Sequence, residues 1–517
     1  MRILLLRPPR YLWPFNSEQS AFWQPLGLLC IAAAARRALP GLDLAVWDAP
    51  GQAWGWRTLA RKLAERPIDV LGLGEETASA HEGLRAAALT KRLHPGCLVV
   101  AGGVHYPHAI EATLATGCID VIVRGEGEHT FVELLHCLEA GRTWQAVAGL
   151  AFRDAAGRTT LTPPRPLIAD LDTLPLPAYD LVDMTRYGRG SRNHPDLIAL
   201  EHSRGCIDSC GFCVLWKQMG ESLDGNGRVR PRYRTKSPGR SFDEVCWLHR
   251  QYGRRTFGWV DPTFNAASEW SDGWAELVLK SKLVGPRGRP RTLHTAWVRA
   301  DCVVRDEKLG ILGKLVRAGL RQVVLGLERD DSAGLGLLGK HNNNPELCAE
   351  AIAIFREKYP QVYTIGSVII GLPGDRPDSP RRLCQWADGL GVDCCLMIPL
   401  TPIPGTRFAE DAACSRLVAN TNWAAYNFHT PVCTTGAATL RDLDATYARR
   451  MLTLSPSRLA SLWRGLIVER DARKRRVNWA LLRHGARVGI ESLWRMLRGP
   501  AGAEPTSYAR RPSWYDT

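Results

Sequence analysis

Apolar and polar positions alternate in two ways along the first 145 residues of the chain. Short apolar runs predict buried strands at residues 2–6, 42–47, 70–73, 98–102 and 121–123. Between them, apolar residues that recur every three or four positions predict helices at residues 25–37, 56–64, 79–93 and 130–139. Strands that alternate with helices are typical of a parallel, doubly wound sheet, so we expect a Rossmann-like α/β domain over residues 1–145.

A second alternating region covers residues 196–408. Its expected strands span residues 197–201, 256–260, 293–298, 322–327, 364–370 and 393–398. This pattern predicts a partial (β/α)6 barrel, in which functional residues lie on loops at the carboxyl ends of the strands. The proline-rich residues 146–195 are predicted to be a linker with little structure of its own. Residues 409–517 predict a helical C-terminal region with helices at 440–451, 457–470 and 477–498.

Composition restricts the class of protein. A chain of 517 residues exceeds a single hydrophobic core and predicts two to four domains. It has no apolar run of about 18 residues, so we expect no transmembrane helix, and the short apolar run after Met1 predicts a strand rather than a signal peptide. The odd number of cysteines, 15, fits free thiols in a reducing cytoplasm.

The net charge of +15 favours acidic partners, and much of the excess lies between Arg464 and Arg498. One interpretation is a solvated basic helical face. The alternatives are contact with an anionic membrane surface or with an acidic substrate.

Three cysteines with the spacing C-x3-C-x2-C carry the strongest chemical signal: Cys206, Cys210 and Cys213. Three thiolates on one loop suit three irons of a [4Fe–4S] cluster and leave the fourth iron open. A zinc site is the structural alternative, but it usually needs four ligands in two spaced pairs, and no second pair follows at that spacing. Their position after the expected strand 197–201 places them at the carboxyl end of a barrel strand.

This cysteine triplet resembles the signature of the radical S-adenosylmethionine (SAM) enzymes. The resemblance implies a [4Fe–4S] cluster that binds SAM, cleaves it reductively to a 5′-deoxyadenosyl radical and requires anaerobic conditions. It also implies SAM contacts at Phe212 beside the last cysteine and at four strand ends: Asp261, Arg299, Glu328 and Gly371. Charged residues at strand ends are, alternatively, solvated or ion-paired. Side chains that act on the substrate are not identified.

The N-terminal region resembles the cobalamin-binding domain that precedes one class of radical SAM barrels. The resemblance rests on residues 25–28 and on two glycine-rich turns, and it implies cobalamin contacts at Gly102, Gly103, His105, Gly125, Glu126 and Gly127. The D-x-H-x-x-G motif, whose histidine would bind cobalt, is absent, so cobalamin without that ligand is implied. A histidine such as His105 can instead only pack its loop, and the whole domain can be a Rossmann-like domain without a cofactor.

Two enzyme activities fit these resemblances. Most enzymes of this architecture methylate an unactivated carbon of a small molecule. Alternatively, the segment Tyr426-Asn427-Phe428 and the helical basic tail resemble the anaerobic magnesium-protoporphyrin monomethyl ester oxidative cyclases, which oxidise a tetrapyrrole side chain. That segment can also be a packing motif shared by a wide family. A flavodoxin- or ferredoxin-type electron donor is implied in either case.

Two further classes are less well supported. The net charge allows an RNA-modifying enzyme, but no RNA-binding module is recognisable. A carrier of cobalamin or of an iron–sulfur cluster would not need the strand-end residues.

Overall fold

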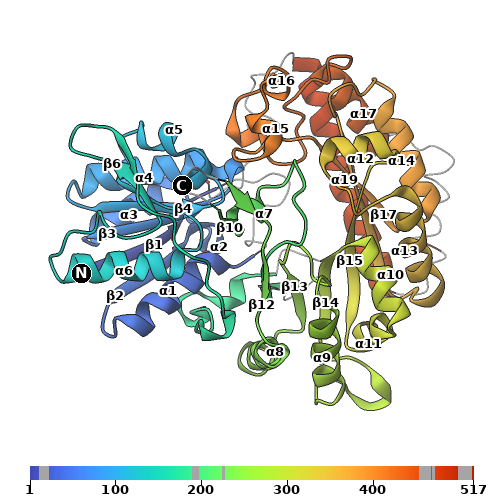
Figure 1. Cartoon of the computed structure of the whole chain (residues 1–517), viewed down its shortest axis with the longest axis horizontal. Coiled ribbons are helices and arrows are strands. Elements are labelled where there is room, and N and C mark those ends of the chain that lie inside the picture. The colour runs from blue at the N-terminus through green and yellow to red at the C-terminus, as the bar shows by residue number, and fades with distance from the viewer. Residues whose placement is uncertain are drawn as a thin grey trace.

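The computed structural model describes residues 1–10, 23–188, 197–223, 228–452, 467, 472–498 and 515–516. Figure 1 shows an N-terminal α/β region in blue and cyan beside a second α/β region in green and yellow, with the C-terminal helices in orange and red on the second. The three regions expected from the sequence are therefore present, and the predicted fold class is confirmed.

The N-terminal region is built on a seven-stranded sheet with the order β2-β1-β3-β4-β5-β6-β7. The first five strands are parallel, and β6 and β7 are added antiparallel. The strands are β1 (Arg2–Arg7), β2 (Asp43–Asp48), β3 (Val70–Glu75), β4 (Leu98–Gly103), β5 (Val121–Val123), β6 (Leu150–Arg153) and β7 (Thr159–Leu161). The helices are α1 (Leu26–Ala38), α2 (Ala49–Gln52), α3 (Trp56–Glu65), α4 (Ala80–Leu93), α5 (Ile110–Leu114) and α6 (Gly127–Glu139), with 3-10 turns η1 (Thr77–Ser79) and η2 (Tyr106–His108).

The expected linker differs from the prediction in its first part. Strands β6 and β7 lie within residues 146–195 and extend the first sheet, so the statement that this segment has little structure is wrong up to Leu161. The two strands of this antiparallel hairpin are only four and three residues long, and Pro163 and Pro164 follow them closely, so the sequence gives little strand signal here. Only short turns follow it, namely η3 (Leu171–Thr173), η4 (Tyr179–Leu181) and η5 (Met184–Arg186).

The second region contains a six-stranded parallel sheet with the order β17-β16-β15-β14-β13-β8. All six strands expected from the sequence are present: β8 (Leu197–Leu200), β13 (Thr256–Trp259), β14 (Leu293–Val298), β15 (Leu320–Glu328), β16 (Tyr363–Ile370) and β17 (Cys394–Pro399). The accompanying helices are α8 (Pro238–Tyr252), α9 (Ser268–Leu279), α10 (Ala300–Lys308), α11 (Ile311–Arg317), α12 (Ser332–Leu338), α13 (Pro345–Lys358) and α14 (Ser379–Leu390), with η6 (Pro286–Gly288). In the described part of the chain β8 and β17 are the two edges of this sheet, as in a partial barrel.

Two small two-stranded ribbons and a short helix lie between β8 and α8 in the chain. Strands β9 (Ser203–Gly205) and β12 (Tyr233–Thr235) pair antiparallel, and we call this pair the cysteine ribbon because Cys206 follows it directly. Strands β10 (Glu221–Ser222) and β11 (Val229–Arg230) form the second ribbon, and α7 (Leu215–Gln218) lies beside them.

The C-terminal region is helical, as expected. It contains α15 (Arg407–Glu410), α16 (Ala412–Ser415), η7 (Trp423–Ala425), α17 (Leu440–Leu452) and α19 (Ala472–Arg498). Helix α19 packs on α17, and its Lys474 and Asn478 contact Asp393 and Tyr363 at the amino ends of barrel strands. The expected helix at 457–470 lies outside the described residues, apart from Ile467.

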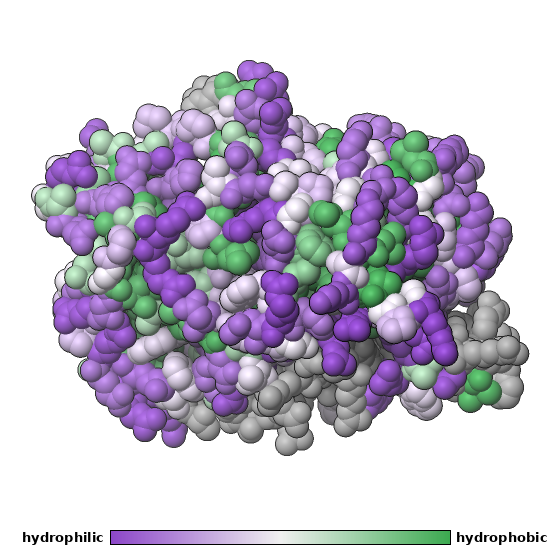
Figure 2. Space-filling model, turned by 90° about the horizontal axis from the view of Figure 1, so that it is seen from below, coloured by the Kyte–Doolittle hydropathy of each residue, from purple (hydrophilic) through white to green (hydrophobic). Residues whose placement is uncertain are grey.

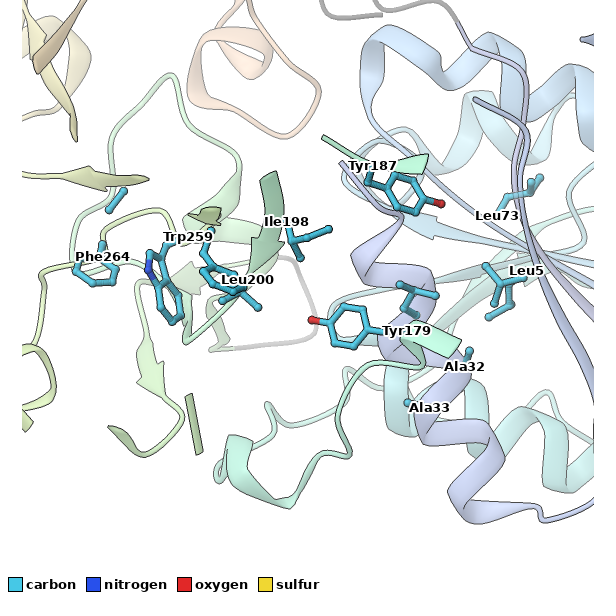
Figure 3. Close-up of a cluster of buried hydrophobic side chains, with 14 of the residues drawn as sticks. Leu5, Ala32, Ala33, Leu73, Tyr179, Tyr187, Ile198, Leu200, Trp259 and Phe264 are labelled. Carbon is cyan, nitrogen blue, oxygen red and sulfur yellow. The ribbon is translucent and has the colours of Figure 1, made fainter. Parts of the chain in front are cut away.

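One continuous apolar core joins the two α/β regions. Figure 3 shows Leu5 and Leu73 of the first sheet on one side, Ile198 and Leu200 of the barrel on the other, and Tyr179 between them. Because the core crosses the junction, the two regions are packed as one body rather than joined by a free tether.

The surface is mostly polar. Figure 2 shows apolar patches interrupted by hydrophilic side chains on one face of the molecule. Among the described helices, none is long and apolar enough to cross a membrane.

Candidate functional site

The loop of residues 206–213, the cysteine loop, begins at the end of the cysteine ribbon. Gly205 has a φ of +80°, and a Cβ at this position would overlap the carbonyl oxygen of Arg232, so only glycine fits. Thiols Cys206, Cys210 and Cys213 are free and partly exposed. The backbone N–H of Cys213 donates to the carbonyl of Cys210 at 3.1 Å, which makes a tight turn between two of the thiols.

Groups from a strand end and from the end of helix α12 hold the cysteine loop in place. The Arg299 guanidinium donates to Asp208 in the loop at 2.8 Å and to both oxygens of Asp301 at 3.0 and 2.8 Å. On the other side the N–H of Gly211 donates to the carbonyl of Leu338 at 2.8 Å. Arg299 therefore stabilises the cysteine loop through its contact with Asp208. Its role in binding the SAM carboxylate stays a prediction.

The donor set fits an iron–sulfur cluster. Burial raises the pKa of the Cys210 thiol, and the nearby positive charge of Lys340 acts in the opposite direction. Thiolate is the form that binds iron, and loss of the thiol protons to iron removes the cost of burying a bare anion. Among the described residues, no three His, Cys, Asp or Glu side chains converge on one point to hold a single ion. A cluster does not require this, because each thiolate binds a different iron.

Asp261, the acid just after β13, is buried, and one of its two carboxylate oxygens accepts several hydrogen bonds inside the protein. Its Oδ1 accepts from the backbone N–H groups of His202 and Ser203 at 2.9 and 2.5 Å and from the Ser203 hydroxyl at 2.8 Å. Its Oδ2 lies 2.9 Å from Nδ1 of His202. Burial alone would raise the pKa of Asp261, but the contacts with His202 and Ser203 hold it below its usual value. The side chain thus fixes the turn between β8 and the cysteine ribbon, and direct contact with SAM stays a prediction.

Glu328 ends β15 in an uncommon conformation. Its φ is +61°, and its carboxylate folds back to accept from Lys340 at 2.7 Å. Lys340 also donates to the Gly326 carbonyl at 3.3 Å. A non-glycine residue in the left-handed region costs about 1 kcal/mol or more, and such strain is concentrated at functional sites. The Glu328–Lys340 pair is buried close to Cys210, so it places a carboxylate and an ammonium group beside the cysteine loop.

Phe212 contacts an apolar cluster, and Gly371 lies in the chain segment that supplies two members of that cluster. Phe212 packs against the cluster formed by Leu338, Ile369, Leu372, Leu400 and Phe408. Gly371 has a φ of +77°, and its N–H donates to Asp375 at 3.1 Å. Gly371 stands between Ile369 and Leu372 of this cluster in sequence, and a Cβ on it would come within 3.3 Å of Leu443. The contacts of Phe212 and Gly371 with SAM stay predictions.

The turn after β4 lies at the carboxyl edge of the first sheet, where ligands of doubly wound folds bind. A Cβ on Gly103 would come within 2.7 Å of the backbone N of Glu75, so β4 can approach β3 only with glycine here. Gly102 is the preceding residue of the same strand. His105 is completely buried, and its Nδ1 lies 3.2 Å from the Thr77 hydroxyl.

His105 has an unused polar atom. Its Nε2 is buried without a hydrogen-bond partner in the described structure. Burial, and then the nearby His81 and His108, lower its pKa to about 4, so the ring is neutral at pH 7. The ring of Trp423 from the C-terminal region lies 4.2 Å away, centroid to centroid. An orphaned nitrogen at the strand ends is the feature of this edge that fits a bound cofactor.

The turn after β5 lies at the junction with the barrel instead. A Cβ on Gly127 would come within 2.8 Å of Ile31, so Gly127 allows α6 to pack on α1, while Gly125 contributes a left-handed φ of +76°. Both oxygens of Glu126 are used: they accept from Arg204 and Arg234 and from the backbone N–H of Ile168. The structure therefore gives Glu126 a role between the regions, and its contact with cobalamin stays a prediction.

Several site residues were not found from the sequence. Lys340 and His202 carry no motif, since a single lysine or histidine is common in any chain. Arg204 and Arg234 also lack a predicted role, because their partner Glu126 lies far away in sequence. Tertiary contacts alone reveal these pairs.

Comparison with known proteins identifies a family model and relatives for this chain. Residues 17–135 match the family model described as B12 binding domain. An uncharacterized methyltransferase of Pyrococcus horikoshii is 28% identical over 434 residues, which cover 84% of this chain and 87% of the relative. The anaerobic magnesium-protoporphyrin IX monomethyl ester cyclase of Synechocystis is 31% identical over 366 residues, 69% of this chain and 66% of the relative.

A solved structure shares the fold. It is the radical S-adenosylmethionine methyltransferase TsrM from Kitasatospora setae with cobalamin and [4Fe-4S] cluster bound, which superimposes with a TM-score of 0.67 at 16% identity. The match covers 95% of this chain and 100% of that one. The order of regions, from first sheet to barrel to C-terminal helices, is therefore that of a known architecture.

Proposed function

Because this chain belongs to the cobalamin-binding radical SAM enzymes, we propose that it methylates an unactivated carbon of a small molecule. The observation that carries the proposal is the junction itself: the matched B12 binding domain contacts, through Glu126 and Glu128, the ribbon that leads into the three cysteines. The relatives named methyltransferase or methylase support the same activity.

Cys206, Cys210 and Cys213 would hold the cluster, and the carboxyl edge near His105 would hold cobalamin. When bound, the cluster supplies an electron for cleavage of SAM, and cobalamin supplies a methyl group. The chain's own residues provide position and exclusion of water. Arg299 and Asp208 stiffen the cysteine loop, the Glu328–Lys340 pair offers an acceptor and a donor next to it, and Phe212 closes its apolar side.

A neutral His105 is suited to the cobalamin edge. Since its pKa is about 4, it adds no charge to a neutral corrin face at pH 7, and its Nε2 remains available for one hydrogen bond. We propose that this atom contacts the cofactor and does not act as a proton donor in the reaction.

Oxidation of a tetrapyrrole side chain is the second candidate. It is favoured by the 31% identity to the cyclase and by residues 426–428. In the structure Asn427 accepts from the N–H groups of His429 and Thr430 at 3.0 and 2.9 Å, and Tyr426 packs with Val214 and Val432. Tyr426 and Asn427 thus have structural roles, so the segment by itself does not decide between the two candidates.

The deciding experiment is anaerobic reconstitution followed by product analysis. The wild-type enzyme is given iron, sulfide, SAM, reductant and hydroxocobalamin, and 5′-deoxyadenosine, S-adenosylhomocysteine and bound corrin are quantified. All three support methylation. Deoxyadenosine and corrin without S-adenosylhomocysteine support the oxidative candidate, and absence of both nucleoside products contradicts a radical SAM enzyme.

We also propose an electron donor, a cellular compartment and a membrane contact for this enzyme. A flavodoxin- or ferredoxin-type protein would supply the electron. All 15 cysteines are free, which favours a reducing compartment such as the cytoplasm.

Helix α19 exposes Trp479, Ile490 and Leu493 together with Arg476 and Arg483, a combination that favours contact with anionic lipid. Co-sedimentation with phosphatidylglycerol vesicles, but not with phosphatidylcholine vesicles, would support that contact, and equal binding to both or to neither would contradict it.

A further inference from the structure

Two buried arginines face each other across the cysteine ribbon. Arg204 of β9 and Arg234 of β12 are directly opposite in the antiparallel register, and they are only 5% and 8% exposed. Like charges directly opposite on paired strands destabilise the pairing, and burial increases the cost. The ribbon therefore needs carboxylates from elsewhere in the protein.

Most of those carboxylates come from the B12 binding side of the junction. Arg204 donates to Glu126 at 3.0 Å and to Glu128 at 2.5 Å, and Arg234 donates to both oxygens of Glu126 at 3.1 and 3.0 Å. Glu201, just before the ribbon, supplies a third acceptor at 3.0 Å from Arg204. We call these five side chains the clamp.

The clamp connects helix α6 of the first region with the residues just before Cys206. On one side Glu126 and Glu128 flank the start of α6, whose first residue, Gly127, packs on α1. On the other side Arg204 is two residues before Cys206, and Gly205 between them has no room for a side chain. Movement of the first region would therefore displace Arg204, which is two residues before the first thiol.

We propose that the clamp makes the cysteine ribbon form only against the docked B12 binding domain, and so fixes the position of the cysteine loop relative to that domain. Its members are positioning residues. Without Glu126 and Glu128, the two buried guanidinium groups of Arg204 and Arg234 remain opposite each other. Of the three clamp carboxylates, Glu201 alone is then left to pair with them. Pairing of β9 with β12 is then the local structure most weakened.

The first test needs no cofactor. Hydrogen exchange is compared in the wild type, in the double variant Glu126→Gln/Glu128→Gln and in the charge-retaining variant Glu128→Asp. We expect exchange in β9 and β12 to rise about tenfold or more in the double variant, with little change in β3 and β16. Glu128→Asp should stay close to the wild type.

A matched control separates the clamp from any ion pair at the junction. Arg36 and Asp180 also connect the first region with the linker, at 2.7 Å, but both are exposed. Arg36→Met should leave exchange in the ribbon unchanged, since exposed pairs contribute little. Unchanged exchange in the double variant, or a uniform rise across both sheets, would overturn the proposal.

The second readout rests on the proposed function. In reconstituted enzyme, S-adenosylhomocysteine release requires both halves of the site to face each other, whereas deoxyadenosine release requires only the cysteine loop and SAM. We expect the double variant to lose about tenfold in the first product and about threefold or less in the second, at comparable iron content. A parallel loss of both products would overturn the positioning role. If the wild type releases neither product, the proposed function fails, and the exchange result still decides the clamp.

Discussion

Replacement of Asp261 distinguishes a structural role of this residue from direct contact with SAM. Asp261→Ala removes an oxygen that accepts three hydrogen bonds, from two backbone N–H groups and one hydroxyl, at a site where the side chain is buried. A buried donor without a partner costs about 1–3 kcal/mol, and local relaxation makes the sum smaller than three full penalties, so we expect a loss of about 3–5 kcal/mol. The turn that carries His202 and Ser203 is the part that loosens.

Asp261→Asn provides the matched comparison. The amide keeps an oxygen that can accept the same three bonds, but it lacks the negative charge beside His202. Since hydrogen bonds to a charged group are roughly twice as strong as neutral ones, we expect this variant to lose only about 1–3 kcal/mol. Asp272→Ala removes a partly exposed pair with Lys314 in the same barrel and should cost about 0–1 kcal/mol.

Three measurements check this reasoning: urea unfolding, iron per chain after reconstitution, and SAM affinity. We expect iron content to fall in the order wild type, Asn, Ala, together with stability, because the turn precedes the cysteine ribbon. A stable Asp261→Ala protein with full iron content and a selective loss of SAM affinity would refute the structural role. In that case the carboxylate contacts SAM directly.

Three further predictions follow from single sites. Cys210→Ala should abolish cluster absorbance and lower iron per chain, and an unchanged iron content would contradict the cluster assignment. Lys340→Met leaves the buried Glu328 carboxylate without its ammonium partner and should lower the free energy of unfolding in urea by about 3–5 kcal/mol. The double variant Lys340→Met/Glu328→Gln should recover part of this loss, and a loss below about 1 kcal/mol in the single variant would rule out this pairing. Burial raises the pKa of Glu75 to about 7. In the folded protein Glu75 therefore keeps a proton that the unfolded chain releases near pH 4–5, and this contribution to stability is lost as pH rises through 7. Glu75→Gln should therefore gain about 3 kcal/mol over the wild type at pH 8 and nothing at pH 4, as measured by thermal unfolding; a difference independent of pH would show that Glu75 does not titrate in this range.

The sequence alone determined the parallel strands of both sheets, because a buried strand leaves a short apolar run that can be read locally. It also determined the cysteine loop, since cluster ligands must be close together in sequence to share one loop. It missed the β6–β7 hairpin, because strands of four and three residues give almost no local signal.

Only the tertiary structure decided what the charged residues do. Asp261, Arg299 and Glu126 stood at the expected strand ends, yet each is engaged by partners from other elements: His202 and Ser203, Asp208, and Arg204 with Arg234. A charge can be paired with any opposite charge that the fold brings near, and those partners are up to 108 residues away in sequence. Periodicity records which face of an element is buried, but it does not record what is packed against that face, and so the clamp and the Glu328–Lys340 pair became visible only in three dimensions.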